Sequence, residues 1–140
     1  VFAGDGPLRA VTQSQCPDAI FLGMCTQEQL SEIYASADLL VFPSMTETFG
    51  NVTLESLASA TPVLAYNSAA AGAFIEHDKN GWLAECDDAK QFVNCALDIT
   101  QNITTLANAR QHAHLSVKHL SWDEIASQVE ALFQRAIQQG

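Results

Sequence analysis

The stretch FPSMTETFGNVTLESLASATPVLA, residues 42–65, decides the fold of this chain. An apolar run, Asp38–Phe42, stops at Pro43 and gives way to a polar turn. A helical pattern begins near Asn51, and a second apolar run follows at Pro62–Ala65. Short apolar runs on either side of a helical pattern predict a strand, a loop, a helix and a second strand, in that order.

Two carboxylates lie in this stretch, Glu47 in the predicted loop and Glu55 one turn inside the predicted helix. Glu55 is displaced from Asn51 by roughly 6 Å along the helix axis, at about 1.5 Å of rise per residue. Side chains on a helix lean toward its N-terminus. We therefore expect Glu55 to lean toward the same end of the helix as Glu47.

The start of that helix leaves backbone N–H groups without intrahelical partners at Phe49, Gly50, Asn51 and Val52. The helix dipole is positive at this end and attracts phosphate, and Gly50 lets a phosphate approach the backbone closely. Carboxylates beside a phosphate repel it unless each accepts hydrogen bonds from the ligand, and sugar hydroxyls donate such bonds. The pattern suits a ligand with a central diphosphate and a polyol on each side, such as a nucleotide sugar.

These residues resemble the signature of glycosyltransferase family 4 (glycosyl transferases group 1), which are retaining enzymes of the GT-B architecture. The resemblance extends in order through Phe2–Leu8, Ile20–Cys25, Leu30–Ser44, His77–Leu83 and Leu120–Trp122. It implies that Glu47 is catalytic and contacts the transferred sugar, and that Glu55 binds the ribose hydroxyls. The N–H groups at the helix start would bind sugar and phosphate. The implied substrate is a UDP-, GDP- or ADP-sugar, with no cofactor and no required metal.

Composition narrows the function classes. The chain has 140 residues and a formal charge of −10, which disfavours nucleic acid and anionic lipid as partners. Its length suits one domain with a single core, and no apolar run reaches membrane-spanning length. The cysteines form no C-x-x-C pair and suggest thiols in a reducing, cytoplasmic compartment. Peripheral attachment at the inner face of a membrane would depend on a lobe outside this chain.

The remainder of the chain alternates short strands with helices. Strands are expected near residues 1–3, 19–22 and 82–84, and helices near 8–15, 26–37, 73–76, from 87 onward and from 121 to the end. Such alternation predicts an α/β fold, a Rossmann-like parallel sheet with helices on both faces. Ligands bind at the carboxyl ends of the strands in such folds. Trp82, Trp122 and the apolar stripe of the last helix are interpreted as core, although the resemblance to GT-B enzymes implies that the last helix can instead cross back toward the other lobe.

Four further residues are candidates for the donor site. Gly4 and Gly6 form a turn after a strand, which suits either a phosphate-binding turn or a purely structural one. Gly23 and Met24 follow the next strand, and by resemblance they lie beside the nucleotide base, although Met24 also suits simple packing. The four histidines are interpreted as solvated.

The resemblance also has departures. Ala60 stands where the family usually has glycine, and Ala69–Gly72 replaces a commoner glycine pair. The family's diphosphate-binding Arg and Lys, its first strand and its acceptor lobe all precede the segment that matches Phe2–Leu8. We interpret residues 1–140 as the C-terminal donor-binding lobe of a longer enzyme, inactive alone, with a gap in its sheet that a rearranged, swapped or partner strand would close.

Three alternatives remain open at this point. A sugar-nucleotide epimerase or a phosphorylase of similar architecture would share the predicted site. A non-catalytic interaction module would keep only the fold. A dinucleotide oxidoreductase is disfavoured, because the first turn lacks a third glycine and the acids lie at a later helix.

Overall fold

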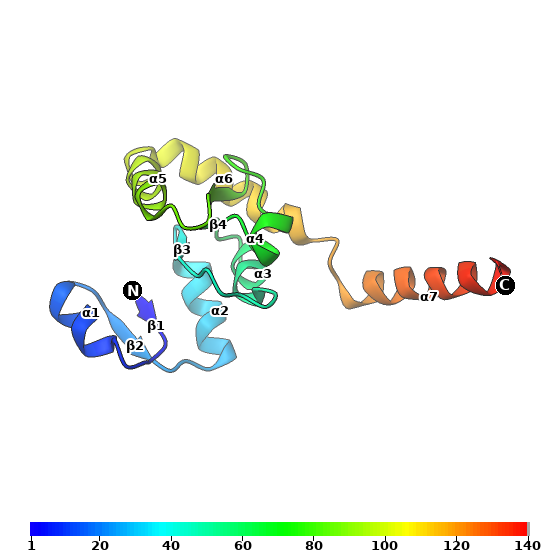
Figure 1. Cartoon of the computed structure of the whole chain (residues 1–140), viewed down its shortest axis with the longest axis horizontal. Coiled ribbons are helices and arrows are strands. Elements are labelled where there is room, and N and C mark those ends of the chain that lie inside the picture. Colours follow the sequence, from blue (N-terminus) through cyan, green and yellow to red (C-terminus); the bar gives the residue numbers. More distant parts are fainter. Residues whose placement is uncertain (140) are drawn as a thin grey trace.

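A computed structural model of the chain, which describes residues 1–139, shows parallel strands alternating with helices (Figure 1). The five strands are β1 (Phe2–Ala3), β2 (Phe21–Gly23), β3 (Leu40–Phe42), β4 (Val63–Tyr66) and β5 (Gly81–Ala84). The helices are α1 (Arg9–Gln15), α2 (Gln27–Ser36), α3 (Asn51–Ala58), α4 (Ala69–Phe74), α5 (Ala89–Gln101), α6 (Ile103–Val117) and α7 (Trp122–Gln139). The predicted α/β class is confirmed.

The strands form two separate parallel sheets. One has the order β1-β2, and the other has the order β3-β4-β5. In the second sheet Leu40 pairs with Val63, and Val63 pairs with Gly81, so the three carboxyl ends lie at the same edge. The two sheets are not hydrogen-bonded to each other, and β1 and β3 are both edge strands with one neighbour, as the predicted gap between them requires.

The core has two layers, one on each face of the larger sheet. Successive residues of β4 point to opposite faces, and all four are buried. Val63 and Ala65 pack with α3, α4 and the end of α6. Leu64 and Tyr66 pack with α5 and the first part of α6. A strand with both faces covered reads as a continuous apolar run, which is how this segment appears in the sequence.

Side-chain caps fix where several helices begin and end. Thr26 and Gln29 form the predicted capping box of α2. At the other end of α2, the Arg110 guanidinium donates to the carbonyls of Ala35 at 2.7 Å and Ala37 at 2.6 Å. A cation on the last carbonyls of a helix also complements its dipole. Arg110 therefore ties α6 to α2 across the fold.

The interpretation of the C-terminal helix as core was wrong. Figure 1 shows α7 extending away from the rest of the chain. Trp122 is 85% exposed, Phe133 is 66% exposed and Ile137 is 80% exposed. The apolar stripe was read correctly as one helical face, but a stripe does not specify which surface covers it. Trp82, in contrast, is 3% exposed and belongs to the core as predicted.

The short helix after β4 begins earlier than predicted. It was expected near residues 73–76, whereas α4 spans Ala69–Phe74. The small residues of 66–72, which include three consecutive alanines, are typical of a loop. Ala70 and Ala71 are buried against the core, and tertiary contact makes this segment helical.

Ala60, the departure from the family's usual glycine, adopts a left-handed backbone with φ of 60°. This region is unfavourable for residues with a Cβ atom. We expect Ala60→Gly to raise the free energy of unfolding by about 0.5–1 kcal/mol, because relief of strain exceeds the added entropy of the unfolded chain. Chemical denaturation followed by circular dichroism measures the change.

Ala58→Gly is the matched control, since Ala58 is the last residue of α3. Glycine in a helix costs up to about 1 kcal/mol relative to alanine, so this variant should be less stable than the parent. Equal destabilisation by both substitutions would show that the left-handed backbone at Ala60 carries no strain.

Candidate functional site

The predicted site lies where β3 and β4 end and α3 begins. The helix starts at Asn51 as predicted, and its N-cap residue, Gly50, has φ of 95°. Glycine adopts this left-handed conformation without the penalty that a Cβ atom brings. A Cβ atom at Gly50 would also lie 3.4 Å from the Cβ of Ala70. That distance is an ordinary van der Waals contact, so the backbone conformation rather than packing accounts for glycine at this position.

The first two backbone N–H groups of α3 remain available for a ligand. No described residue accepts a hydrogen bond from the N–H of Asn51 or Val52, whereas the N–H of Thr53 donates to the Gly50 carbonyl at 3.0 Å. Asn51 is exposed and Val52 is partly exposed, but Gly50 is buried. The positive end of the helix is therefore reached at Asn51 and Val52 rather than at Gly50.

Glu47 is held on one side of this helix start. Its Oε1 accepts a hydrogen bond of 2.7 Å from the Ser44 hydroxyl, and the residue is only partly exposed. Ser44 follows β3 by two residues, so the hydrogen bond fixes the carboxylate near the carboxyl end of the strand. This leaves Glu47 Oε2 with no hydrogen-bond partner among the described residues.

Glu55, on α3 itself, is contacted by α2. The Tyr34 hydroxyl donates to Glu55 Oε2 at 3.4 Å, a long hydrogen bond. Burial, the neighbouring Glu55 charge and the hydrogen bond to Glu55 together raise the pKa of Tyr34 from 10.0 to about 12, with burial the largest cause. The phenol is thus kept protonated and serves as the donor that orients this carboxylate.

A small depression lies beside Glu47 at the start of α3. Glu47, Phe49 and Gly50 line it from the loop, and Tyr66 and Ala70 line it from β4 and α4. Its volume is about 10 Å³, roughly the space of one water molecule. Glu55 is not part of its lining. The described residues around the start of α3 therefore enclose no more than this small space.

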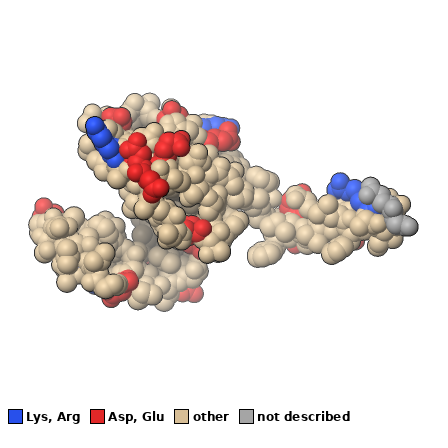
Figure 2. All heavy atoms as spheres, viewed as in Figure 1, with Lys and Arg blue, Asp and Glu red and all other residues tan. Residues whose placement is uncertain are grey.

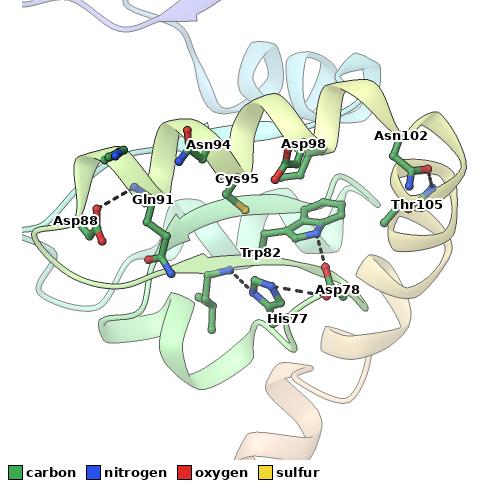
Figure 3. Close-up of a pocket in the computed structure, with 13 residues that line it drawn as sticks. His77, Asp78, Trp82, Asp88, Gln91, Asn94, Cys95, Asp98, Asn102 and Thr105 are labelled. Atoms are coloured by element: carbon green, nitrogen blue, oxygen red, sulfur yellow. Dashed lines mark hydrogen bonds and ion pairs between the residues drawn. The ribbon is translucent and has the colours of Figure 1, made fainter.

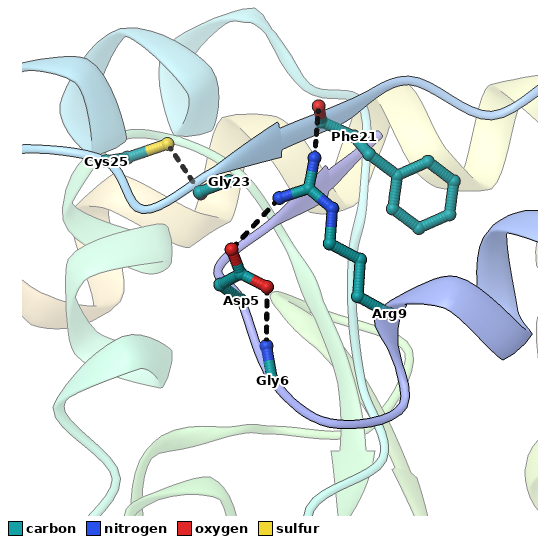
Figure 4. A network of polar contacts seen from close by, with 6 residues as sticks. All are labelled: Asp5, Gly6, Arg9, Phe21, Gly23 and Cys25. Atoms are coloured by element: carbon teal, nitrogen blue, oxygen red, sulfur yellow. Dashed lines mark hydrogen bonds and ion pairs between the residues drawn. The ribbon is translucent and has the colours of Figure 1, made fainter.

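The glycine turns come together at the carboxyl ends of β1 and β2. The Gly4 N–H donates to the Gly23 carbonyl at 2.7 Å. Gly6 lies in the same turn, where its N–H donates to Asp5 Oδ1 at 2.8 Å (Figure 4). Gly4 and Gly23 both have positive φ, of 120° and 72°. Met24 follows with 79% exposure, so it does not pack as filler here.

Arg9 is a candidate that the sequence interpretation missed. Its Nη1 lies 3.2 Å from Asp5 Oδ2, and its Nη2 donates to the Phe21 carbonyl at 3.5 Å (Figure 4). The guanidinium thus lies beside the turns of Gly4 and Gly23. Its position on the first turn of α1 was the available signal, because that turn follows a strand end. Ser44 and Tyr34 were missed too, since their roles depend on contacts with the two acids.

Comparison with known proteins identifies the family. The model for glycosyl transferases group 1 matches residues 1–102. The chain belongs to this family. It is 31% identical over 129 residues to a GDP-mannose-dependent alpha-mannosyltransferase of Corynebacterium glutamicum. The aligned region covers 92% of this chain and 31% of that protein. It is 32% identical over 117 residues to a D-inositol 3-phosphate glycosyltransferase of Corynebacterium urealyticum, covering 81% of this chain and 27% of that protein.

Solved structures show the same fold. Anabaena HepE in complex with UDP matches with a TM-score of 0.78 and 20% identity over 95% of this chain and 40% of HepE. Sucrose-phosphate synthase of Thermosynechococcus elongatus matches with a TM-score of 0.77 and 23% identity over 98% of this chain and 38% of that one. The group 1 chain therefore has a GT-B-type lobe, and it spans about a third of the length of its curated relatives. No helix within residues 1–139 has the length and apolarity needed to cross a bilayer.

The different partners of the two acids give a direct test of the site geometry. In a Tyr66→Phe background, Tyr34 is the remaining tyrosine of the chain. We expect Glu55→Gln to lower the pKa of Tyr34, because it removes a negative charge beside the phenol. Absorbance at 295 nm during alkaline titration measures this pKa, with circular dichroism at each pH to confirm that the chain is folded.

Glu47→Gln is the matched control, because Glu47 bonds Ser44 instead. The sign of the stability effect follows from the raised pKa: the contribution of Tyr34 is fully present below pH 10 and is lost as the pH rises toward 12. A titration curve that Glu55→Gln leaves unchanged would contradict the contact between Glu55 and Tyr34.

Proposed function

We propose that this chain is the donor-binding lobe of a retaining glycosyltransferase of family 4, which transfers a hexose from a nucleoside diphosphate sugar to an acceptor hydroxyl. The observation that carries the proposal is the open start of α3, with N–H groups at Asn51 and Val52 that no described residue accepts from, and with the carboxylates of Glu47 and Glu55 each contacted by a hydroxyl. Membership of the group 1 family supports it. Two similar proteins also support it: HepE, which was solved in complex with UDP, and the GDP-mannose-dependent alpha-mannosyltransferase.

In this proposal each group has a separate task. The diphosphate lies at the positive end of α3, where Asn51 and Val52 donate to its oxygens. Glu55, oriented by Tyr34, accepts from the ribose hydroxyls. Glu47, oriented by Ser44, accepts from hydroxyls of the transferred sugar. The loop of Phe49 completes the sugar side, while Gly4, Gly6, Gly23 and Met24 border the nucleotide.

The reaction would develop positive charge at the anomeric carbon while the diphosphate leaves. Glu47 stabilises the positive centre, and the helix start stabilises the departing anion. The acceptor hydroxyl attacks from the face that the diphosphate leaves, which retains the anomeric configuration. This lobe carries few cations near the helix start, so Arg9 and cations from elsewhere would neutralise the remaining diphosphate charge. Neither a metal nor a cofactor is part of the proposal.

The proposal makes the two acids differ in the steps they affect. In the full-length protein, Glu47→Gln should lower kcat at least about a hundredfold with little change in nucleotide affinity, since its contact strengthens as charge develops. Glu55→Gln should weaken nucleotide binding about tenfold, because a hydrogen bond to a charged acceptor is lost. Calorimetric titration with UDP, GDP and ADP and radiolabelled sugar transfer measure the two effects.

Glu130→Gln on α7 is the control acid and should leave both quantities unchanged. Transfer with an inverted anomeric centre, seen by NMR, would contradict the retaining mechanism. Isomerisation or phosphorolysis of the donor without transfer would favour an epimerase or a phosphorylase. Absence of nucleotide binding by the folded, full-length protein would favour an interaction module and overturn the proposal.

We further propose that another parallel strand of the longer enzyme fills the gap between β1 and β3. The Leu40 N–H donates to the Pro62 carbonyl, toward β4, so the backbone groups of the next residue, Val41, face the gap. Val41 is 48% exposed and Phe2 of β1 is 44% exposed. Two open, parallel, apolar edges suit one buried parallel strand.

Hydrogen exchange tests this second proposal. The Val41 amide should exchange rapidly in the isolated 140-residue chain and become protected in the full-length protein, because a new strand supplies its acceptor. The Leu64 amide of the central strand β4 is the control and should be protected in both. Rapid exchange of Val41 in both proteins would show that no strand fills the gap.

A further inference from the structure

A groove lies beside the other edge of the larger sheet, along the outer strand β5. Its volume is about 540 Å³, and none of the donor-site candidates lines it. Figure 3 shows α5 along one side of the groove, with Cys95 and Asp98 on the side of the helix nearer the strands and Asn94 also in the lining. The turn before β5 supplies His77 and Asp78 on the other side.

The back of the groove is a strand edge. The Asn67 N–H donates to the Ala84 carbonyl at 2.8 Å, so the backbone of Ala84 faces β4. Because backbone groups of successive strand residues point to opposite sides, those of Leu83, which lines the groove, point away from β4, and Glu85 follows directly after the end of the strand. The Leu83 carbonyl accepts no hydrogen bond from any described residue. β5 therefore presents a free acceptor to the groove.

The backbone N–H groups of Leu83 and Glu85, which point away from β4, donate only to side chains. The Leu83 N–H donates to His77 Nδ1 at 3.0 Å, and the Glu85 N–H donates to Gln91 Oε1 at 2.6 Å. Both contacts are exposed. A peptide carbonyl can replace each of these acceptors without leaving a donor unsatisfied. The edge is thus capped in the free chain and can still pair with an added strand.

The groove is acidic. Three aspartates line it, Asp78, Asp88 and Asp98, whereas Lys90 is the single Lys or Arg in the lining. Burial raises the pKa of the Cys95 thiol, and the charges of Asp78 and then Asp98 raise it further. These two carboxylates therefore converge on the same part of the groove. Figure 2 shows acidic side chains outnumbering basic ones over the part of the molecule that carries α5.

We propose that this groove binds a basic, extended segment of a partner protein, which adds as a strand to the edge of β5 between Leu83 and Glu85. The backbone of the segment pairs with β5, and its Lys or Arg side chains reach Asp78 and Asp98. This is strand addition beside a helix, in which main-chain bonds give affinity and side-chain pockets give specificity. The inference concerns a different edge of the sheet and goes beyond the proposed function.

Charge identifies the partner as a different protein. A second copy of this chain carries a formal charge of −10 and has only six Lys and Arg residues among 140. Two such chains repel each other, and like charges disfavour self-pairing across an acidic groove. A basic segment has the opposite charge, so long-range attraction favours its approach.

A blocked hexapeptide of alternating lysine and valine is the probe for the full-length protein. We expect calorimetry to detect its binding, and we expect Asp98→Asn to weaken that binding about three- to fivefold, the size of one partly exposed ion pair. Asp123→Asn on α7 is the matched control and should bind as the parent does. Melting temperature and circular dichroism confirm that each variant is folded.

Two further peptides separate strand addition from simple charge attraction. An alternating glutamate and valine peptide should not bind, and a lysine and valine peptide with N-methylated backbone amides should lose binding, because it cannot donate to the Leu83 carbonyl. Equal binding by either peptide would overturn the proposal, as would absence of binding by the first probe.

A diazirine-bearing lysine and valine peptide should cross-link to residues 82–98, and cross-links confined to other segments would also overturn it.

Discussion

The parallel pairing of β3 with β4 is the constraint on which the rest of the structure depends. Two adjacent parallel strands need a crossover, and here α3 supplies it. The helix must begin beyond the carboxyl end of β3 and return along the sheet face. Its positive end is thereby fixed at the edge where β4 also ends. The loop with Glu47 and the first turns of α3 with Glu55 therefore lie at that same edge of the sheet.

The same pairing determines how the two acids are held. The segment before β3 is α2, so its Tyr34 lies against the side of α3 that carries Glu55. The segment after β3 is the loop, so Ser44 reaches Glu47. One strand thus separates the partners of the two carboxylates. Each acid has its own orienting hydroxyl, which suits two contacts with different parts of one ligand.

The edges of the sheets differ in a way that assigns them different roles. The β3 edge carries apolar, open backbone and faces the gap next to β1. The outer edge of β5 is capped by His77 and Gln91. An uncapped edge suits permanent continuation into further structure, whereas side-chain caps on an outer edge limit unwanted pairing and can be replaced by a matching strand. The contrast supports a continuous sheet through the gap and a reversible contact at β5.

The sequence by itself determined the local features of this protein. Thr26 and Gln29 specify the start of α2, and the change of period at Asn51 specifies the start of α3, because both signals act within one helical turn. The buried run of β4 and the α/β alternation also follow from periodicity. Tertiary structure alone decided that α7 stands apart with Trp122 exposed, that Tyr34 orients Glu55, and that a groove follows β5. These features join residues distant in the chain, and a local pattern shows which face is apolar without showing what meets it.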